Sequence, residues 1–253
     1  ARSLVQTLRD HVGYVKLGME FFYAHGAEGY RAVAEEGVPV FLDLKLHDIP
    51  NTVGQGLRSL MALAPAPAII NVHATGGLDM MKAARDVVAP STKLIAVTIL
   101  TSLSNDNIHA AGFDAARDTA VHALSLAKLT HSAGLDGVVC SPHDLAGIRK
   151  SLPRSFLTVV PGIRPADAAV HDQKRIATPK SAVDAGADIL VIGRAITGAT
   201  DPAAAAQAIL ESLACPSLRS AAFPRPKHWT APSMLVLILS ALFSFQRARA
   251  MCW

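Results

Sequence analysis

Residues 41–52 read Phe-Leu-Asp-Leu-Lys-Leu-His-Asp-Ile-Pro-Asn-Thr, and apolar and polar side chains alternate from position 42 to position 47. Successive side chains of a β-strand point to opposite faces, so this period places leucines on one face and polar groups on the other. The leucines are Leu42, Leu44 and Leu46, and the polar residues are Asp43, Lys45 and His47. The segment therefore predicts a strand that buries one face, carries charge on the other and ends before Pro50.

Apolar runs and longer helical stretches alternate along the first 211 residues. The candidate strands are residues 14–17, 38–45, 68–73, 93–98, 137–140, 156–161 and 189–192. Ala-rich segments with helical spacing lie between them, for example at 115–133 and 181–186. This alternation predicts βαβ units and a parallel sheet. Right-handed crossovers leave two arrangements open, a doubly wound sheet or a closed (β/α)8 barrel.

A closed barrel of this class has eight strands, whereas the sequence predicts seven. Residues 3–10, ahead of the first candidate strand, have helical character. A helix in this place is expected of a barrel whose first strand is missing. In such a barrel Asp43 and Lys45 would point inward near the C-terminal mouth, because active sites of this fold are built there.

The composition is that of a folded domain with a sizeable core, with 51% hydrophobic and 17% charged residues. Five of the 24 Lys and Arg residues follow Ser212, where there is no Asp or Glu, so residues 1–211 hold 19 cations against 20 anions. The net charge of +4 thus belongs to the last segment, and we expect no nucleic-acid groove. The cysteines at 140, 215 and 252 form no C-x-x-C pattern, which favours a reducing compartment and gives no zinc motif.

The character of the sequence changes at Ser212. Both tryptophans lie beyond this point, and residues 234–245 are apolar except for two serines. A transmembrane helix needs about 20 apolar residues, so we expect no membrane span here. We predict a barrel domain at 1–211 and an atypical, dispensable segment at 212–253 that is not part of the barrel.

The pattern Asp43-x-Lys45 alone would more often be an ion pair on a solvated edge strand, but the leucine face argues against an exposed edge. Together with Ile-Pro-Asn-Thr at 49–52, the pattern Asp43-x-Lys45-x-x-Asp48 resembles the signature of the orotidine 5′-phosphate decarboxylase family. The resemblance covers roughly residues 10–210 and includes further motifs in the family's order. These motifs are Val15-Lys16-Leu17-Gly18, Asn71-Val72-His73-Ala74, Thr98-Ile99-Leu100-Thr101-Ser102, Pro161-Gly162-Ile163-Arg164-Pro165, Gln173 and Val191-Ile192-Gly193-Arg194.

The resemblance implies a (β/α)8 TIM barrel and a cytoplasmic enzyme of pyrimidine biosynthesis that decarboxylates orotidine 5′-phosphate to UMP without a cofactor or metal. It implies that Lys45 stabilises the charge at C6 of the ring and then protonates it. Asp43 would face the departing carboxylate, while Lys16 and Asp48 would complete an alternating array of charges.

The resemblance also assigns binding roles. Thr101 and Ser102 would read the pyrimidine ring. The loops after the last two strands would bind the 5′-phosphate. The residues assigned to this role are Pro161, Arg164, Gln173, Gly193 and Arg194. Asp48 and Thr52 would reach the neighbouring subunit's site, so a homodimer with shared active sites is implied.

Two alternatives stay open. A magnesium-dependent sugar-phosphate decarboxylase would share Asp-x-Lys-x-x-Asp but lack the His-Asp-Ile-Pro-Asn-Thr string found at 47–52. A noncatalytic phosphate-binding barrel or inactive fragment is the second, because the family's first strand carries an aspartate that touches the ribose and nothing before Ser3 supplies it.

Overall fold

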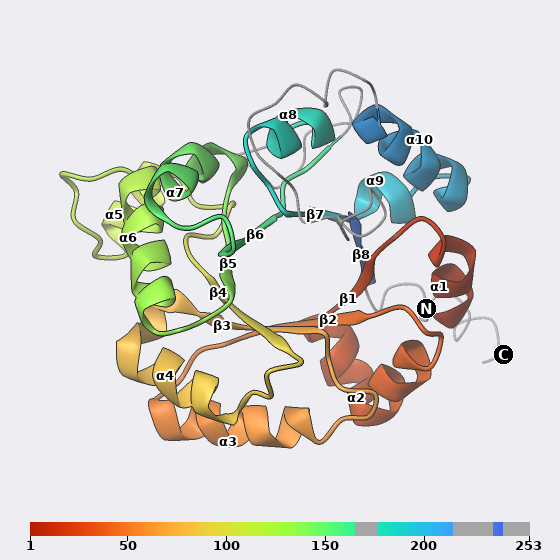
Figure 1. Ribbon diagram of the computed structural model, residues 1–253, viewed down its shortest axis with the longest axis horizontal. Coiled ribbons are helices and arrows are strands. Elements are labelled where there is room, and N and C mark those ends of the chain that lie inside the picture. The colour runs from red at the N-terminus through yellow and green to blue at the C-terminus, as the bar shows by residue number, and fades with distance from the viewer. Residues whose placement is uncertain (165–176, 215–234, 240–253) are drawn as a thin grey trace, which may run out of the picture.

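Seven parallel strands form at the predicted apolar runs and lie side by side in chain order (Figure 1). They are β1 (Tyr14–Gly18), β2 (Val40–Leu46), β3 (Ile69–His73), β4 (Lys93–Val97), β5 (Gly137–Val139), β6 (Leu157–Val160) and β7 (Ile189–Ile192). The computed structural model describes residues 1–164, 177–214 and 235–239. Within them, the predicted parallel α/β sheet is confirmed.

An eighth strand, β8 (Leu235–Leu239), closes the barrel between β7 and β1. It runs parallel to both neighbours, and Leu237 lies opposite Val15 of β1 and Ile192 of β7. The prediction that residues 212–253 lie outside the barrel is therefore wrong for β8. The physical reason is that β7 and β1 would each leave an unpaired edge, and an uninterrupted aliphatic segment is well suited to pair with both.

The helix predicted ahead of the first strand is α1 (Arg2–Leu8), and no strand precedes β1 in residues 1–13, all of which are described. The position beside β1 in which the missing first strand was expected is occupied by β8. The barrel is thus completed by a strand from the far end of the sequence.

Helices surround the sheet on its outer side (Figure 1). They are α2 (Met19–Ala34), α3 (Pro50–Met61), η1 (Ala74–Gly76), α4 (Gly77–Val87), α5 (Asn105–Ala110), α6 (Thr119–Ser132), η2 (Pro142–Asp144), α7 (Leu145–Ser151), α8 (Pro179–Asp184), α9 (Arg194–Thr197) and α10 (Pro202–Ala214). Local signals begin several of them: Pro50 is the first residue of α3, and the Asp118 side chain accepts a hydrogen bond from the Val121 N–H at 2.9 Å. No helix in the described part of the chain is long and apolar enough to span a membrane.

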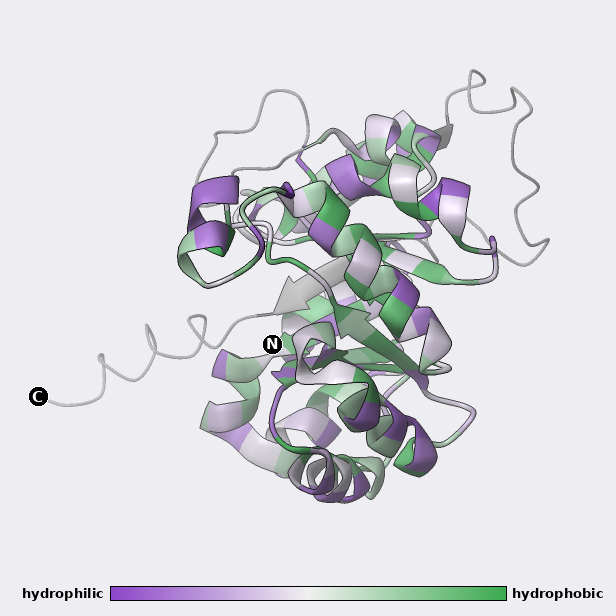
Figure 2. Cartoon of the chain, turned by 90° about the vertical axis from the view of Figure 1, so that its left-hand side faces the viewer, coloured by the Kyte–Doolittle hydropathy of each residue, from purple (hydrophilic) through white to green (hydrophobic). Residues whose placement is uncertain are grey.

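Hydrophobic side chains fill two spaces, the barrel interior and the layer between sheet and helices. The interior cluster consists of Phe41, Ile69, Ile95, Val159, Ile189 and Val191. The outer layer contains the leucine face of β2, with Leu42 and Leu44 buried against the helices. Figure 2 shows that the helices carry both hydrophobic and hydrophilic residues. The period of two read from the sequence is confirmed, since Phe41 and Leu42 belong to different clusters.

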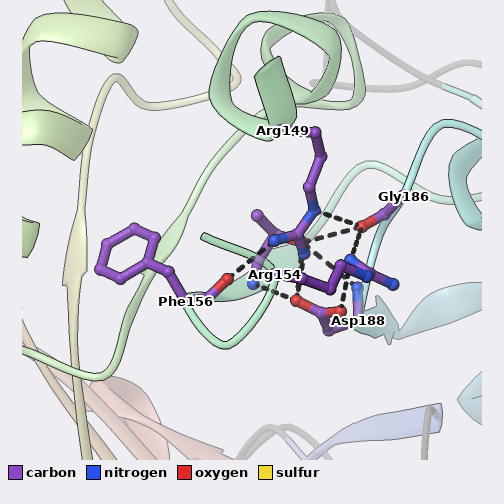
Figure 3. Close-up of polar contacts among 6 residues, drawn as sticks. Arg149, Arg154, Phe156, Gly186 and Asp188 are labelled. Atoms are coloured by element: carbon purple, nitrogen blue, oxygen red, sulfur yellow. Dashed lines mark hydrogen bonds and ion pairs between the residues drawn. The ribbon is translucent and has the colours of Figure 1, made fainter. Parts of the chain in front are cut away.

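A buried polar cluster joins α7 to the N-terminal ends of β6 and β7 (Figure 3). Asp188, which directly precedes β7, accepts a hydrogen bond from the Thr158 N–H at 2.8 Å and pairs with the guanidinium groups of Arg149 and Arg154. Arg149 also donates to the carbonyl oxygens of Phe156 and Gly186, each at 2.8 Å. The cluster lies at the end of the barrel opposite the mouth, where polar residues serve stability rather than chemistry.

Candidate active site

A cavity of about 200 Å³ opens at the C-terminal ends of the strands. Its charged wall comes from β1 and β2, and its remaining wall from the ends of β4 to β7. The lining residues are Lys16, Phe41, Asp43, Lys45, Val97, Ile99, Leu100, Thr101, Val139, Cys140, Pro161 and Val191. A mainly apolar wall facing a few convergent charges is the usual composition of a small-molecule site.

Asp43 stands between two ammonium groups. Its Oδ2 accepts a hydrogen bond from Lys16 Nζ at 2.6 Å, and its Oδ1 accepts one from Lys45 Nζ at 2.7 Å. Burial by itself raises the pKa of the Asp43 carboxyl, but the charges and hydrogen bonds of Lys16 and Lys45 outweigh it and hold that pKa well below its usual range. Two ammonium groups and one carboxylate leave a net positive charge, so the cavity favours an anionic ligand.

The end of β2 is irregular at Lys45. Leu42 lies opposite Ile70 of β3, whereas Leu46 lies opposite Val72, so the pairing shifts between them. Lys45 has a φ of 51°, the left-handed value that residues with a Cβ rarely adopt. Bulges and unusual backbone angles of this kind are concentrated at functional sites.

Asn71 is a polar residue of the charged cluster for which the sequence predicted no role. It is fully buried on β3, its Nδ2 donates to Asp43 Oδ1 at 2.7 Å, and its Oδ1 accepts from the Lys45 N–H at 2.8 Å. Its position in the motif Asn71-Val72-His73-Ala74 was visible in the sequence. The signal available in the sequence was a polar side chain, Asn71, inside a predominantly apolar predicted strand.

Asp48 and Thr52 do not join the charged cluster within one chain. Asp48 follows β2, is exposed, and accepts a hydrogen bond from the Ile49 N–H at 2.6 Å. Thr52 is exposed in the first turn of α3. Neither side chain is among those that line the cavity.

The other predicted binding residues follow the strand ends at the mouth of the barrel. Thr101, beyond β4, and Pro161, after β6, line the cavity, whereas Ser102 is exposed beside Thr101. Arg164 is half-buried further along the segment that begins at Pro161.

The segment after β7 carries the remaining two predicted residues in the described part of the chain. Gly193 caps the short helix α9 with φ −113° and ψ −102°, and Arg194 begins that helix with an exposed side chain. Neither lines the cavity. Gln173 lies outside the described residues.

Two histidines stand at the rim. The rings of His47 and His73 stack with centroids 5.3 Å apart, and His73 Nδ1 shares a hydrogen bond of 2.7 Å with the Thr75 hydroxyl. Burial, with the nearby charges of His47 and Lys45, lowers the pKa of His73 to about 4. Near neutral pH, His73 is therefore an uncharged hydrogen-bonding group.

Residues 1–209 match the family model described as the orotidine 5′-phosphate decarboxylase / HUMPS family. The chain is 48% identical over 212 residues to an orotidine 5′-phosphate decarboxylase of Erythrobacter litoralis, a match that covers 84% of this chain and 92% of the relative. It is 50% identical over 214 residues to one of Novosphingobium aromaticivorans, covering 84% and 93% of the two chains.

A solved structure gives the same picture. The crystal structure of orotidine 5′-phosphate decarboxylase from Lactobacillus acidophilus superposes with a TM-score of 0.71 at 37% sequence identity. The superposition covers 84% of this chain and 94% of that one. Both the sequence matches and the structural match thus extend over nearly the whole length of the relatives.

Proposed function

The chain belongs to the orotidine 5′-phosphate decarboxylase / HUMPS family, and we propose that it decarboxylates orotidine 5′-phosphate to UMP in pyrimidine biosynthesis. The observation that carries the proposal is the buried Lys16–Asp43–Lys45 cluster on the wall of a barrel-mouth cavity. The relatives named above are all called orotidine 5′-phosphate decarboxylase, so the comparisons do not favour the magnesium-dependent sugar-phosphate decarboxylase.

The chemistry required is the stabilisation of negative charge. Loss of CO2 leaves an electron pair at C6 of the pyrimidine ring, so the transition state has carbanion character. Preorganised cations in a cavity shielded from water stabilise such charge without having to reorganise. Lys45 suits this task because its ammonium group lines the cavity and is fixed by Asp43 at 2.7 Å.

Lys45 then donates a proton to C6, and the electron pair of the broken C–C bond becomes the new C–H bond. Asp43 would face the substrate carboxylate. Two anions brought together disfavour the bound substrate more than the transition state, in which the carboxylate is leaving as neutral CO2. Lys16, the second partner of Asp43, keeps that buried carboxylate paired throughout.

Substrate binding would use the mouth of the barrel. We assign contacts with the pyrimidine ring to Thr101, which lines the cavity, and to Ser102 beside it. Arg164, Gly193 and Arg194 follow β6 and β7, the strands after which barrels commonly bind phosphate, and we assign them to the 5′-phosphate. Pro161 and Gln173 belong to the same proposed phosphate-binding loops. Binding energy gained far from C6 can assist a chemical step at C6.

Asp48 and Thr52 are proposed to act in the neighbouring subunit of a cytoplasmic homodimer. Both are exposed, and neither lines the cavity of the chain to which it belongs. The adjacent Ile49 is 65% exposed, so a large apolar side chain is available for a contact between subunits beside the proposed residues.

The direct test is the conversion of orotidine 5′-phosphate to UMP by the purified chain, followed by the change in ultraviolet absorbance. We expect turnover that resists EDTA and is lost in Lys45→Ala, because we assign both the stabilisation of charge at C6 and its protonation to the Lys45 ammonium group. Full turnover in Lys45→Ala would overturn the assignment. Strong inhibition by EDTA would favour the magnesium-dependent alternative instead.

A further inference from the structure

We propose that Asn71 is a positioning residue for the decarboxylation: through one amide group it sets both the backbone of Lys45 and the carboxylate of Asp43. This inference rests on the proposed function, because it concerns the position and orientation of the Lys45 ammonium group that protonates C6. The observation behind it is the double contact of a fully buried amide at an interruption of the β2–β3 pairing.

The first contact concerns the backbone. Between Leu42 and Leu46 the strand β2 bulges, and the β3 residue that lies between their two partners is Asn71. In a regular parallel ladder the Lys45 N–H would donate to a backbone carbonyl of the neighbouring strand. Here it donates to the side-chain Oδ1 of Asn71 at 2.8 Å. The amide oxygen thus replaces the ladder partner at the point where the backbone departs from the strand.

The φ angle of Lys45 explains why the hydrogen bond from its N–H to Asn71 matters for the position of the side chain. A φ of 51° is disfavoured for lysine and persists only where the surroundings hold it. The same angle determines the direction in which the Lys45 side chain leaves the strand. A loss of the Asn71 contact therefore lets the backbone relax toward the extended region and turns Nζ away from its present place.

The second contact concerns the carboxylate. Asp43 Oδ1 accepts hydrogen bonds from Lys45 Nζ and from Asn71 Nδ2, each at 2.7 Å. The orientation of the amide follows from its partners, because a flipped amide would set its oxygen against the carboxylate and its NH2 against an N–H. Only a neutral side chain with one donor and one acceptor satisfies both neighbours.

Two substitutions separate this role from simple burial. Asn71→Leu keeps the side-chain shape but can neither donate nor accept. Asn71→Asp keeps an acceptor for the Lys45 N–H but sets a second carboxylate against Asp43. The matched control is Thr92→Val, which removes another buried hydrogen bond of the barrel, from Thr92 Oγ1 to the Pro67 carbonyl at 2.7 Å, at the N-terminal end of β4.

For Asn71→Leu we expect kcat to fall by about 100-fold with a much smaller change in KM, because misplacement of a reacting group by about 1 Å has this effect on the chemical step. Asn71→Asp should lose activity as well. Thr92→Val should lower the melting temperature while kcat stays close to wild type. A kcat for Asn71→Leu within threefold of wild type overturns the inference (about 0.7 kcal/mol or less).

A second readout needs no turnover. The rate at which an amine-specific reagent labels Lys45 of the full chain, measured by mass spectrometry, should rise in Asn71→Leu and not in Thr92→Val, since the ammonium is no longer held at Asp43. Equal labelling in wild type and Asn71→Leu overturns the inference. If Lys45→Ala keeps wild-type turnover, the proposed function fails, and the labelling result still decides whether Asn71 positions Lys45.

Discussion

At the scale of single residues, His73 has the clearest dependence on pH. Its folded-state pKa of about 4 lies below the unfolded value of about 6.5, so on acidification the unfolded chain takes up the proton first. The stability contributed by neutral His73 is complete above about pH 6.5 and is lost as the pH falls toward 4.

We expect His73→Gln to flatten the loss of stability between pH 6.5 and 4, because glutamine cannot take up a proton. Urea midpoints at pH 7.0, 5.5 and 4.5 measure the effect. The low pKa of Asp43 acts in a different window, since its contribution disappears only as the pH falls below the unfolded aspartate value of about 3.9. An unchanged slope in His73→Gln would show that another group is responsible.

Residues whose role depends on their own strand were predictable from the sequence, and residues whose role depends on a neighbouring strand were not. The period of two placed Asp43 and Lys45 on the inward face, and both line the cavity. The contacts of Asn71 exist only because β2 bulges against β3. The bulge depends on how the two strands pair, and the sequence pattern of either strand alone does not show it. The placement of Asp48 and Thr52 in a partner's site stays a prediction.

At the scale of secondary-structure elements, the Arg149–Asp188–Arg154 cluster fixes α7 to the base of β6 and β7 (Figure 3). We expect Asp188→Ala to reduce the free energy of unfolding by about 3–5 kcal/mol, because two guanidinium groups then lose their buried counter-charge. The exposed pair Lys180–Asp184 is the control, and Asp184→Ala should cost only about 0.3–0.5 kcal/mol. Urea unfolding of both variants checks the contrast, and equal losses would contradict it.

Strand β8 was missed because its sequence alone is compatible with three different interpretations. Residues 235–239 are uniformly aliphatic, and such a short run is compatible with a strand, a helix or a dispensable segment. The seven strands of the body were predictable because turn signals and helical stretches separate them. What decides the state of 235–239 is the pair of unpaired edges on β7 and β1, which exists only once the other seven strands have formed.

The role of β8 in closure can be tested at Leu237, which faces Val15 and Ile192 across the two ladders. Leu237→Pro removes a backbone donor from the middle of a strand paired on both sides, which sheets do not tolerate. We expect a lower melting temperature and faster proteolysis. Leu237→Val keeps the donor and a side chain suited to strands, and should behave like wild type. A proline variant as stable as wild type would show that the barrel does not depend on β8.

At the scale of the whole molecule, the active site of a single barrel is incomplete if Asp48, the fourth charged residue proposed for it, comes from another subunit. Lys16, Asp43 and Lys45 belong to one barrel, whereas Asp48 is exposed beside the 65%-exposed Ile49. In a twofold-symmetric dimer the same patch contacts its copy, so each subunit would lend Asp48 to the other. Lys45→Ala and Asp48→Ala homodimers should then both be nearly inactive.

Mixing the two variants distinguishes shared sites from separate ones. In a mixed dimer, one site combines Lys45 of the Asp48→Ala subunit with Asp48 of the Lys45→Ala subunit and is intact, while the other site carries both substitutions. If subunits exchange at random in an equal mixture, half of the dimers are mixed and each has one intact site, so about a quarter of wild-type activity should return. Mixing after cross-linking each homodimer is the control and should restore none. Failure of exchanged subunits to recover activity, with mixed dimers demonstrated by mass spectrometry, would place Asp48 outside the partner's site.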